Sequence, residues 1–269
     1  MSRPPRLATV ATVARYTLIE QASRRHLWWI AGIALGLACG LAVMGRFVAL
    51  PGYTTRETVE LFASAPAFYL VLIDLIVLGM GLMRSDIDSG VAALFLSRPV
   101  SAAEYVVGRY LGHAAVLVAA VMILGVGSFA VVAASGTTDW RLLYSFIVLA
   151  YNAALFLAII ALLGLVVGTV PSIAVGGVAF YALGQGSTYL LWGLAGTGTL
   201  SAGVAFAARA FTVLAPHVLA SPLSAGKEAA FNDVGFVVPG PTLPDLLWSL
   251  AWLAGSLWLA VLALRRREL

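Results

Sequence analysis

The sequence contains little charge and almost no cysteine. Only 10 % of its 269 residues are Asp, Glu, Lys or Arg, against about 25 % in an ordinary soluble domain, and 61 % are hydrophobic. The mean hydropathy of +0.98 indicates that lipid surrounds most of the chain. The single cysteine, Cys39, excludes an internal disulfide framework and a cysteine-rich metal site. The net charge of +4 is too small to argue for a nucleic-acid partner.

Several catalytic signatures are also missing. The chain has no GxxxxGK[ST] phosphate-binding loop, since Gly226 and Lys227 are followed by Glu228. It has no HExxH metal motif, and the serine of "GQGST" at 184–188 is misplaced for a GxSxG nucleophile. We therefore expect no enzyme, no catalytic or metal-binding residue and no cofactor bound by this chain.

Six long apolar runs are present. Each has about 19 or more residues, and a helix needs about 20 to cross a hydrocarbon core 30 Å thick. No alternating barrel pattern appears, so backbone hydrogen bonding in lipid requires helices. The sequence therefore predicts an all-α polytopic protein forming one transmembrane domain over residues 1–269, with six transmembrane helices. The runs cover roughly 27–45, 65–83, 111–133, 142–168, 171–192 and 246–264.

The basic residues are distributed unevenly between the segments that join these runs. If the N-terminus is cytoplasmic, the inner segments carry eleven arginines, and the outer segments carry four arginines and one lysine. Positive charge concentrates on the cytoplasmic side of membrane proteins. We therefore predict that both termini and the connector 84–110 are cytoplasmic.

Residues 1–26 form a basic segment before the first run. Leu7, Val10, Val13 and Leu18 recur at helical spacing among polar and basic side chains. This pattern predicts an amphipathic helix lying on the lipid of the inner leaflet. A simple positively charged anchor explains the arginines equally well.

The segment 193–245 is the one long external connection, and it is rich in glycine and proline. It contains a short apolar stretch, 203–215, that holds Arg209. Arginine is costly at a membrane centre, and a seventh span would place the C-terminus outside. We expect an interfacial or re-entrant helix there.

The first run contains a repeated GxxxG pattern, formed by Gly32, Gly36 and Gly40. Small residues allow helix backbones to approach closely in lipid. The pattern predicts a tight helix contact, with a partner either in this chain or in a second copy.

The connector 84–110 is strongly charged although apolar runs flank it. Ser85 is a candidate N-cap, and Ile87, Val91, Leu94 and Phe95 would form one apolar face. The pattern predicts one amphipathic helix up to Arg98, a break at Pro99, and a new helix capped by Ser101 and Glu104. Asp86 and Asp88 in the first turn favour a protein groove over lipid as the surface that buries this face, and ordinary loop packing is the alternative.

This connector resembles the coupling-helix region of type-2 ABC exporter permeases. Arg109 stands where that family more often has Lys, the acids are Asp instead of Glu, and Val91 replaces a common Thr. The segment "ARYTLIEQASRRHLWW" resembles the family's N-terminal surface helix, and the six-span layout matches too. The residues that carry the resemblance are Asp86, Asp88, Gly90, Pro99, Gly108, Arg109 and Gly112.

The resemblance implies a permease subunit of an exporter in a bacterial inner membrane. ATP and Mg would be bound by a separate cytoplasmic ABC ATPase, and a second permease chain, a copy or a relative, would complete the assembly. Asp86 and Asp88 would set the helix start and face basic groups of the ATPase. Gly90 would allow close approach, Pro99 would form the elbow, and Glu104 would cap the restart.

Asp74 lies in the middle of the second run. A carboxylate inside a membrane is a candidate for the transport pathway, or it bridges two helices through a hydrogen bond. Asn152 and Gln185 are interpreted as interhelical hydrogen-bond partners. The alternative function is an ATP-independent secondary transporter, although the inverted repeats common in that class are not evident.

Overall fold

The computed structural model describes residues 6–23, 25–48, 54–97, 99–134, 136, 140–167, 169–186 and 243–266. All regular secondary structure within these ranges is α-helical, which confirms the all-α prediction. The helices are α1 Leu7–Ala22, α2 Arg25–Gly45, α3 Thr55–Leu82, α4 Arg84–Asp88, α5 Val91–Leu96, α6 Ala102–Ala134, α7 Trp140–Val166, α8 Val170–Gly186 and α11 Leu243–Arg266.

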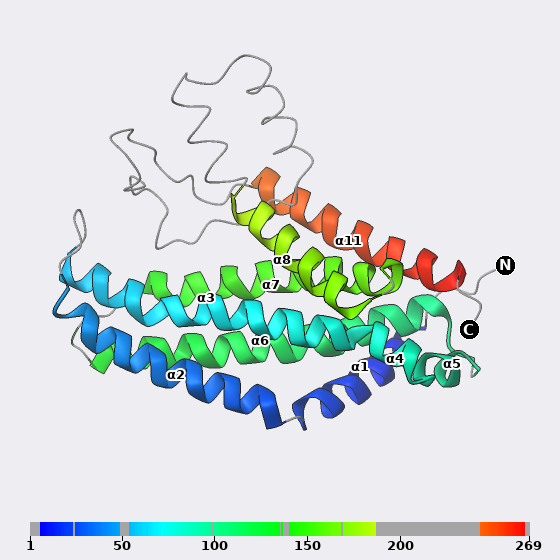
Figure 1. The fold of residues 1–269 in the computed structure, drawn as a ribbon, viewed down its shortest axis with the longest axis horizontal. Helices are drawn as coiled ribbons and strands as arrows, with labels where there is room; N and C mark the ends of the chain where they lie inside the picture. The colour runs from blue at the N-terminus through cyan, green and yellow to red at the C-terminus, as the bar shows by residue number, and fades with distance from the viewer. Residues whose placement is uncertain are drawn as a thin grey trace, which may run out of the picture.

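Helix α7 lies at the centre of an elongated bundle. It contacts α3, α6, α8 and α11, while α2 packs on α3 and α6 (Figure 1). Its buried residues continue without interruption from 155 to 161, and Leu155, Phe156 and Leu157 are all fully covered. A helix that is apolar on all sides is buried by its neighbours, so α7 is the core helix of the bundle.

Within the described ranges, three helices are long and apolar enough to cross a membrane, namely α6, α7 and α11. They support a multi-pass membrane protein. Helices α2, α3 and α8 coincide with three further predicted runs, and their crossing of the membrane stays a prediction. The predicted interfacial or re-entrant helix at 203–215 and the side chain of Gln185 lie outside the described residues, as does most of 193–245.

Helix α6 is longer than a membrane is thick. Its 33 residues span about 50 Å at 1.5 Å per residue, compared with about 30 Å for the hydrocarbon core. Several of its turns therefore extend beyond the core. Its first turns lie at the end of the bundle that also holds α4, α5 and the end of α11 (Figure 1).

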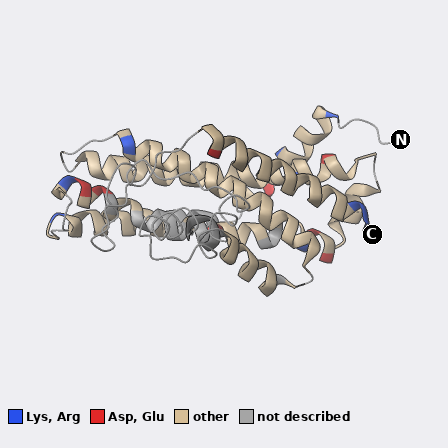
Figure 2. Cartoon of the chain, turned by 90° about the horizontal axis from the view of Figure 1, so that it is seen from above, with Lys and Arg blue, Asp and Glu red and all other residues tan. Residues whose placement is uncertain are grey.

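Charged residues gather toward the two ends of the molecule, and the middle is largely uncharged (Figure 2). This distribution is expected for a bundle whose middle lies in hydrocarbon, where unpaired charge is costly. At one end of α3, Thr54 and Glu57 form a capping box, with the Glu57 N–H donating to Thr54 Oγ1 at 3.3 Å. The other end leads directly into the charged connector.

Candidate functional site

The connector forms two short helices, α4 and α5, where the sequence predicted one. Gly90 separates them with a φ of 75°, a left-handed conformation that glycine adopts most readily. The N–H of Gly90 donates to the Ile87 carbonyl at 3.1 Å, and that of Ser89 to the Ser85 carbonyl at 3.0 Å. These bonds end α4 as glycine ends many helices, so the single-helix prediction was wrong.

The start of α4 also differs from the prediction. The helix begins at Arg84, directly after Met83, and no side chain caps it. Ser85 is therefore not the N-cap. Instead, its carbonyl accepts a hydrogen bond from the Ser89 hydroxyl at 2.7 Å, one turn later.

The two aspartates of the connector lie in opposite environments. The Asp88 side chain is 51 % exposed and pairs with Arg84 one turn earlier, at 2.9 Å. Asp86 is buried, and its carboxylate accepts hydrogen bonds from the Tyr105 hydroxyl and the Arg109 guanidinium. Its predicted contact with an ATPase stays a prediction, and the structure shows an internal role for it.

Burial and neighbouring groups act on Asp86 in opposite directions. Burial raises the pKa of its carboxyl group, while the charge of Arg109 and the hydrogen bonds from Tyr105 and Arg109 work against that rise. The Glu20 carboxylate adds to the rise. Asp86 is thus held in a site where its neighbours must compensate for lost hydration.

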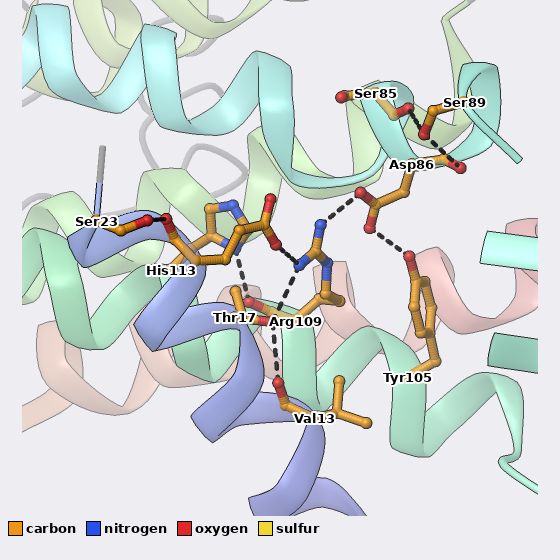
Figure 3. A network of polar contacts seen from close by, with 10 residues as sticks. Val13, Thr17, Ser23, Ser85, Asp86, Ser89, Tyr105, Arg109 and His113 are labelled. Carbon is orange, nitrogen blue, oxygen red and sulfur yellow. Dashed lines mark hydrogen bonds and ion pairs between the residues drawn. The ribbon is translucent and has the colours of Figure 1, made fainter. Parts of the chain in front are cut away.

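Arg109 is the centre of a buried polar network (Figure 3). Its side chain is 1 % exposed. One terminal nitrogen, Nη1, donates to Glu20 at 2.7 Å and to Thr17 at 3.2 Å, both on α1. The other, Nη2, donates to Asp86 on α4. The guanidinium therefore joins three helices that are separate in the sequence.

Sequence reasoning matched Arg109 to a family motif but did not select it as a site residue. The signal was an arginine within an apolar helix, where a charge needs a partner. The partners lie 89 and 23 positions away, at Glu20 and Asp86. One sequence offers no means of pairing such distant residues.

Gly108 and Gly112 bring the backbones of α1 and α6 together. A Cβ at Gly108 would lie 2.7 Å from Val13 Cβ, and one at Gly112 would lie 2.5 Å from Thr17 Cβ. Any side chain at either position would collide with α1. Helix α1 therefore packs against α6, where the sequence predicted a helix resting on lipid.

Glu104 caps two helices at once. Its Oε2 accepts from the Ser101 N–H at 2.7 Å, and the Glu104 N–H donates to Ser101 Oγ at 3.2 Å, which confirms the predicted capping box. Its Oε1 accepts from the N–H of Arg6, the residue before α1, at 2.7 Å. Pro99 lies exposed in the turn between α5 and α6.

The apolar side chains of the connector divide between inside and outside. Phe95 packs between Tyr16 of α1 and Tyr105 of α6, with ring centroids 5.9 and 5.5 Å away. Ile87 also packs on the core. Leu94 points outward and is 68 % exposed. Packing of Phe95 therefore attaches the connector to α1 and α6, while Leu94 stays exposed on its outer surface.

A family model described as "ABC-2 family transporter protein" matches residues 20–269. The chain belongs to the ABC-2 transporter family. A search of curated proteins finds no match. Membership indicates a transporter membrane subunit, a class that normally works with an ABC ATPase partner. Among the described residues, no group of three or more His, Cys, Asp or Glu could hold a metal ion.

Two further predicted groups of this permease are placed by the structure. Asp74 is buried in α3, and its Oδ1 makes no hydrogen bond to the described residues. The transport role and the bridging role of Asp74 both stay predictions. Asn152 is buried in α7.

The GxxxG glycines of α2 face outward. Gly32, Gly36 and Gly40 are exposed, and no described atom lies within 4 Å of a Cβ built on any of them. The opposite side of α2, with its buried alanines at 34, 38 and 42, packs on the bundle. The predicted contact partner of the glycines is therefore not found among the described residues.

Proposed function

We propose that this permease is the membrane subunit of an exporter driven by ATP. A separate cytoplasmic ABC ATPase would bind ATP and Mg and hydrolyse the nucleotide, since this sequence has no phosphate-binding loop. Membership of the ABC-2 family is the observation that carries the proposal. The location is a bacterial inner membrane, with both termini and the connector on the cytoplasmic side.

The ATPase would dock on the outer surface of α4 and α5. Exposed Leu94 supplies an apolar anchor, and Asp88 lies on the same connector as an exposed acid. A short helix with an apolar anchor fits a groove in a partner protein. Asp86, Gly90, Pro99 and Glu104 would act with these residues by shaping the connector.

A second permease chain would contact the open glycine face of α2. Close packing through small residues is the usual means of helix association in lipid, and this face has room for it. The second chain is a copy of this one or a relative. Membrane lipid covers the remaining outward surface.

Asp74 would line the transport pathway. A buried carboxylate oxygen without a described partner supports this role. We expect Asp74→Asn to change transport while the complex with the ATPase still assembles. Unchanged transport by that variant would end the proposal for Asp74.

The function is tested by purifying the tagged chain from native membranes in mild detergent and identifying co-purifying proteins. The wild type is compared with Leu94→Asp in the proposed docking surface. Leu243→Asp is the matched control, because Leu243 is also 68 % exposed but lies at the start of α11. We expect an ABC ATPase with the wild type and the control, and depletion with Leu94→Asp.

Two other outcomes would contradict the proposed function or the proposed docking surface. If no ATPase is captured in several detergents, the proposal fails and the ATP-independent secondary transporter replaces it. If Leu94→Asp retains the ATPase as well as the control does, the function stands but the docking surface is wrong.

A further inference from the structure

Helix α1 is fastened to the connector and to α6 at three separate places. Glu104 holds the first residue before α1 through the Arg6 N–H. Tyr16 of α1 contacts Phe95 of α5 through their rings. Near the end of α1, Thr17 and Glu20 accept hydrogen bonds from Arg109 of α6.

The contact between α1 and α6 leaves no room for sliding. At Gly112, a Cβ would lie 2.7 Å from the Ala14 carbonyl oxygen, and at Gly108 it would lie 3.1 Å from that of Val10. The α6 backbone at these two glycines therefore lies directly against α1, with its backbone carbonyls and the side chains of Val13 and Thr17 in close contact. Moving α1 along α6 would break this packing and expose the buried Arg109.

Arginine is suited to this position because its fork reaches two helices. Nη1 holds the carboxylate of Glu20 on α1, and Nη2 holds that of Asp86 on α4. A lysine has one nitrogen and lacks this planar fork. The family match begins only at residue 20, so most of α1 lies before the matched segment.

We propose that Arg109 is a positioning residue that makes α1, α4, α5 and the first three turns of α6 one mechanical body, called here the Arg109 unit. Force applied at α5 passes to α6 through Asp86 and Arg109, while α1 braces the joint through Glu20. The inference rests on the proposed function, because the ATPase supplies the force. It assigns to α1 a part in coupling in addition to anchoring.

The test adds a covalent tie between two members of the Arg109 unit, α1 and α5, and asks whether it compensates for loss of the Arg109 ion pairs. Tyr16→Cys and Phe95→Cys are introduced together with Cys39→Ser, which removes the single native thiol. A short, cleavable, thiol-reactive cross-linker then joins α1 to α5 in the purified complex with its ATPase. The kcat and KM for ATP are measured before and after cross-linking, with and without Arg109→Met.

In the untied protein, we expect Arg109→Met to lower kcat by about fivefold with KM little changed, as for loss of coupling between distant sites. The cross-link should restore the kcat of Arg109→Met to within about twofold of that of the cross-linked protein with Arg109 intact. Cleaving the cross-link should abolish the rescue. A residue needed only for folding would not be rescued by this tie.

Three results would overturn the proposal. The first is that cross-linking inhibits the double-cysteine protein with Arg109 intact, which would mean that α1 and α5 must separate during turnover. The others are full kcat in Arg109→Met without the cross-link, and no rescue of that variant by the cross-link. If Arg109→Met does not fold, Glu20→Gln and Asp86→Asn remove one arm each and are tested in the same way. Full kcat in both untied single variants would overturn the proposal as well.

Failure of the proposed function is recognised separately, because no ATPase then accompanies the wild type. Cross-linking yield in the chain alone still measures the placement of α1 against α5. A yield that falls with Arg109→Met supports the Arg109 unit. An equal yield refutes it.

Discussion

Two GxxxG stretches of this permease, one in α6 and one in α2, differ in what packs against them. Gly108 and Gly112 of α6 lie buried against α1, so close that an added Cβ would overlap it. Gly32, Gly36 and Gly40 of α2 face outward, with nothing described within 4 Å. In both helices, the spacing marks a place where the backbone of another helix can approach closely. The GxxxG pattern therefore indicates the capacity for close contact and does not identify the partner.

The difference arises from what surrounds each stretch. Polar bonds flank the packed pair, with Glu104 before it holding Arg6 and Arg109 within it holding Thr17 and Glu20. Apolar side chains flank the open glycines, among them exposed Ile33 and Leu37. In lipid, such a surface gains little from burial within its own chain.

The largest expected effect comes from filling the packed stretch. Gly112→Val places a Cβ against the Thr17 side chain and the Ala14 carbonyl, and overpacking of this kind costs about 3 kcal/mol. Thermal unfolding in detergent and protease cleavage before α2 measure the displacement of α1. Gly36→Val is the matched control in α2, and equal stability of the two variants would contradict the close packing of α1 against Gly112.

The polar bonds beside the packed stretch are expected to contribute less. Asp86→Asn weakens a bond to the buried Arg109, and a hydrogen bond to a charged group is worth about 2 kcal/mol. Asp88→Asn removes an exposed pair, which is worth below about 1 kcal/mol. Chemical unfolding of the two variants measures the difference, and a larger loss with Asp88→Asn would contradict the internal role of Asp86.

The open stretch is expected to matter between chains. Gly36→Leu should weaken association of two copies by about tenfold, because close backbone contact in lipid requires small residues. The mass of the purified particle, measured over a range of detergent-to-protein ratios, checks this. Unfolding of the single chain should be unchanged. Unaltered association would mean that lipid alone covers the glycines of α2.

The smallest effect is expected at the break in the connector. Gly90→Ala forces a side chain into a φ of 75°, which costs about 1 kcal/mol. Gly136→Ala has similar strain at a φ of 84°, in the turn between α6 and α7. Thermal unfolding should show similar losses, while ATPase capture should fall only for Gly90→Ala. Equal capture by both would show that the connector tolerates a reshaped break.

Features that depend on neighbours in the sequence were predicted well. The capping box of Ser101 and Glu104 was confirmed, because both partners lie within one turn. The helical character of the apolar runs was also confirmed wherever the structure describes them. The break at Gly90 was missed, since an isolated glycine is tolerated in a helix and the pattern of Ile87, Val91 and Leu94 continues across it.

By itself, the sequence determined an all-helical membrane chain with a charged connector and without an ATP site, since composition and periodicity are local and additive. The tertiary structure alone shows that Asp86 turns inward, that Arg109 joins α1 to α4, and that the glycines of α6 are packed while those of α2 are open. These outcomes depend on residues that are far apart in the chain. Their energies come from desolvation and close contact, which exist only once the helices have met.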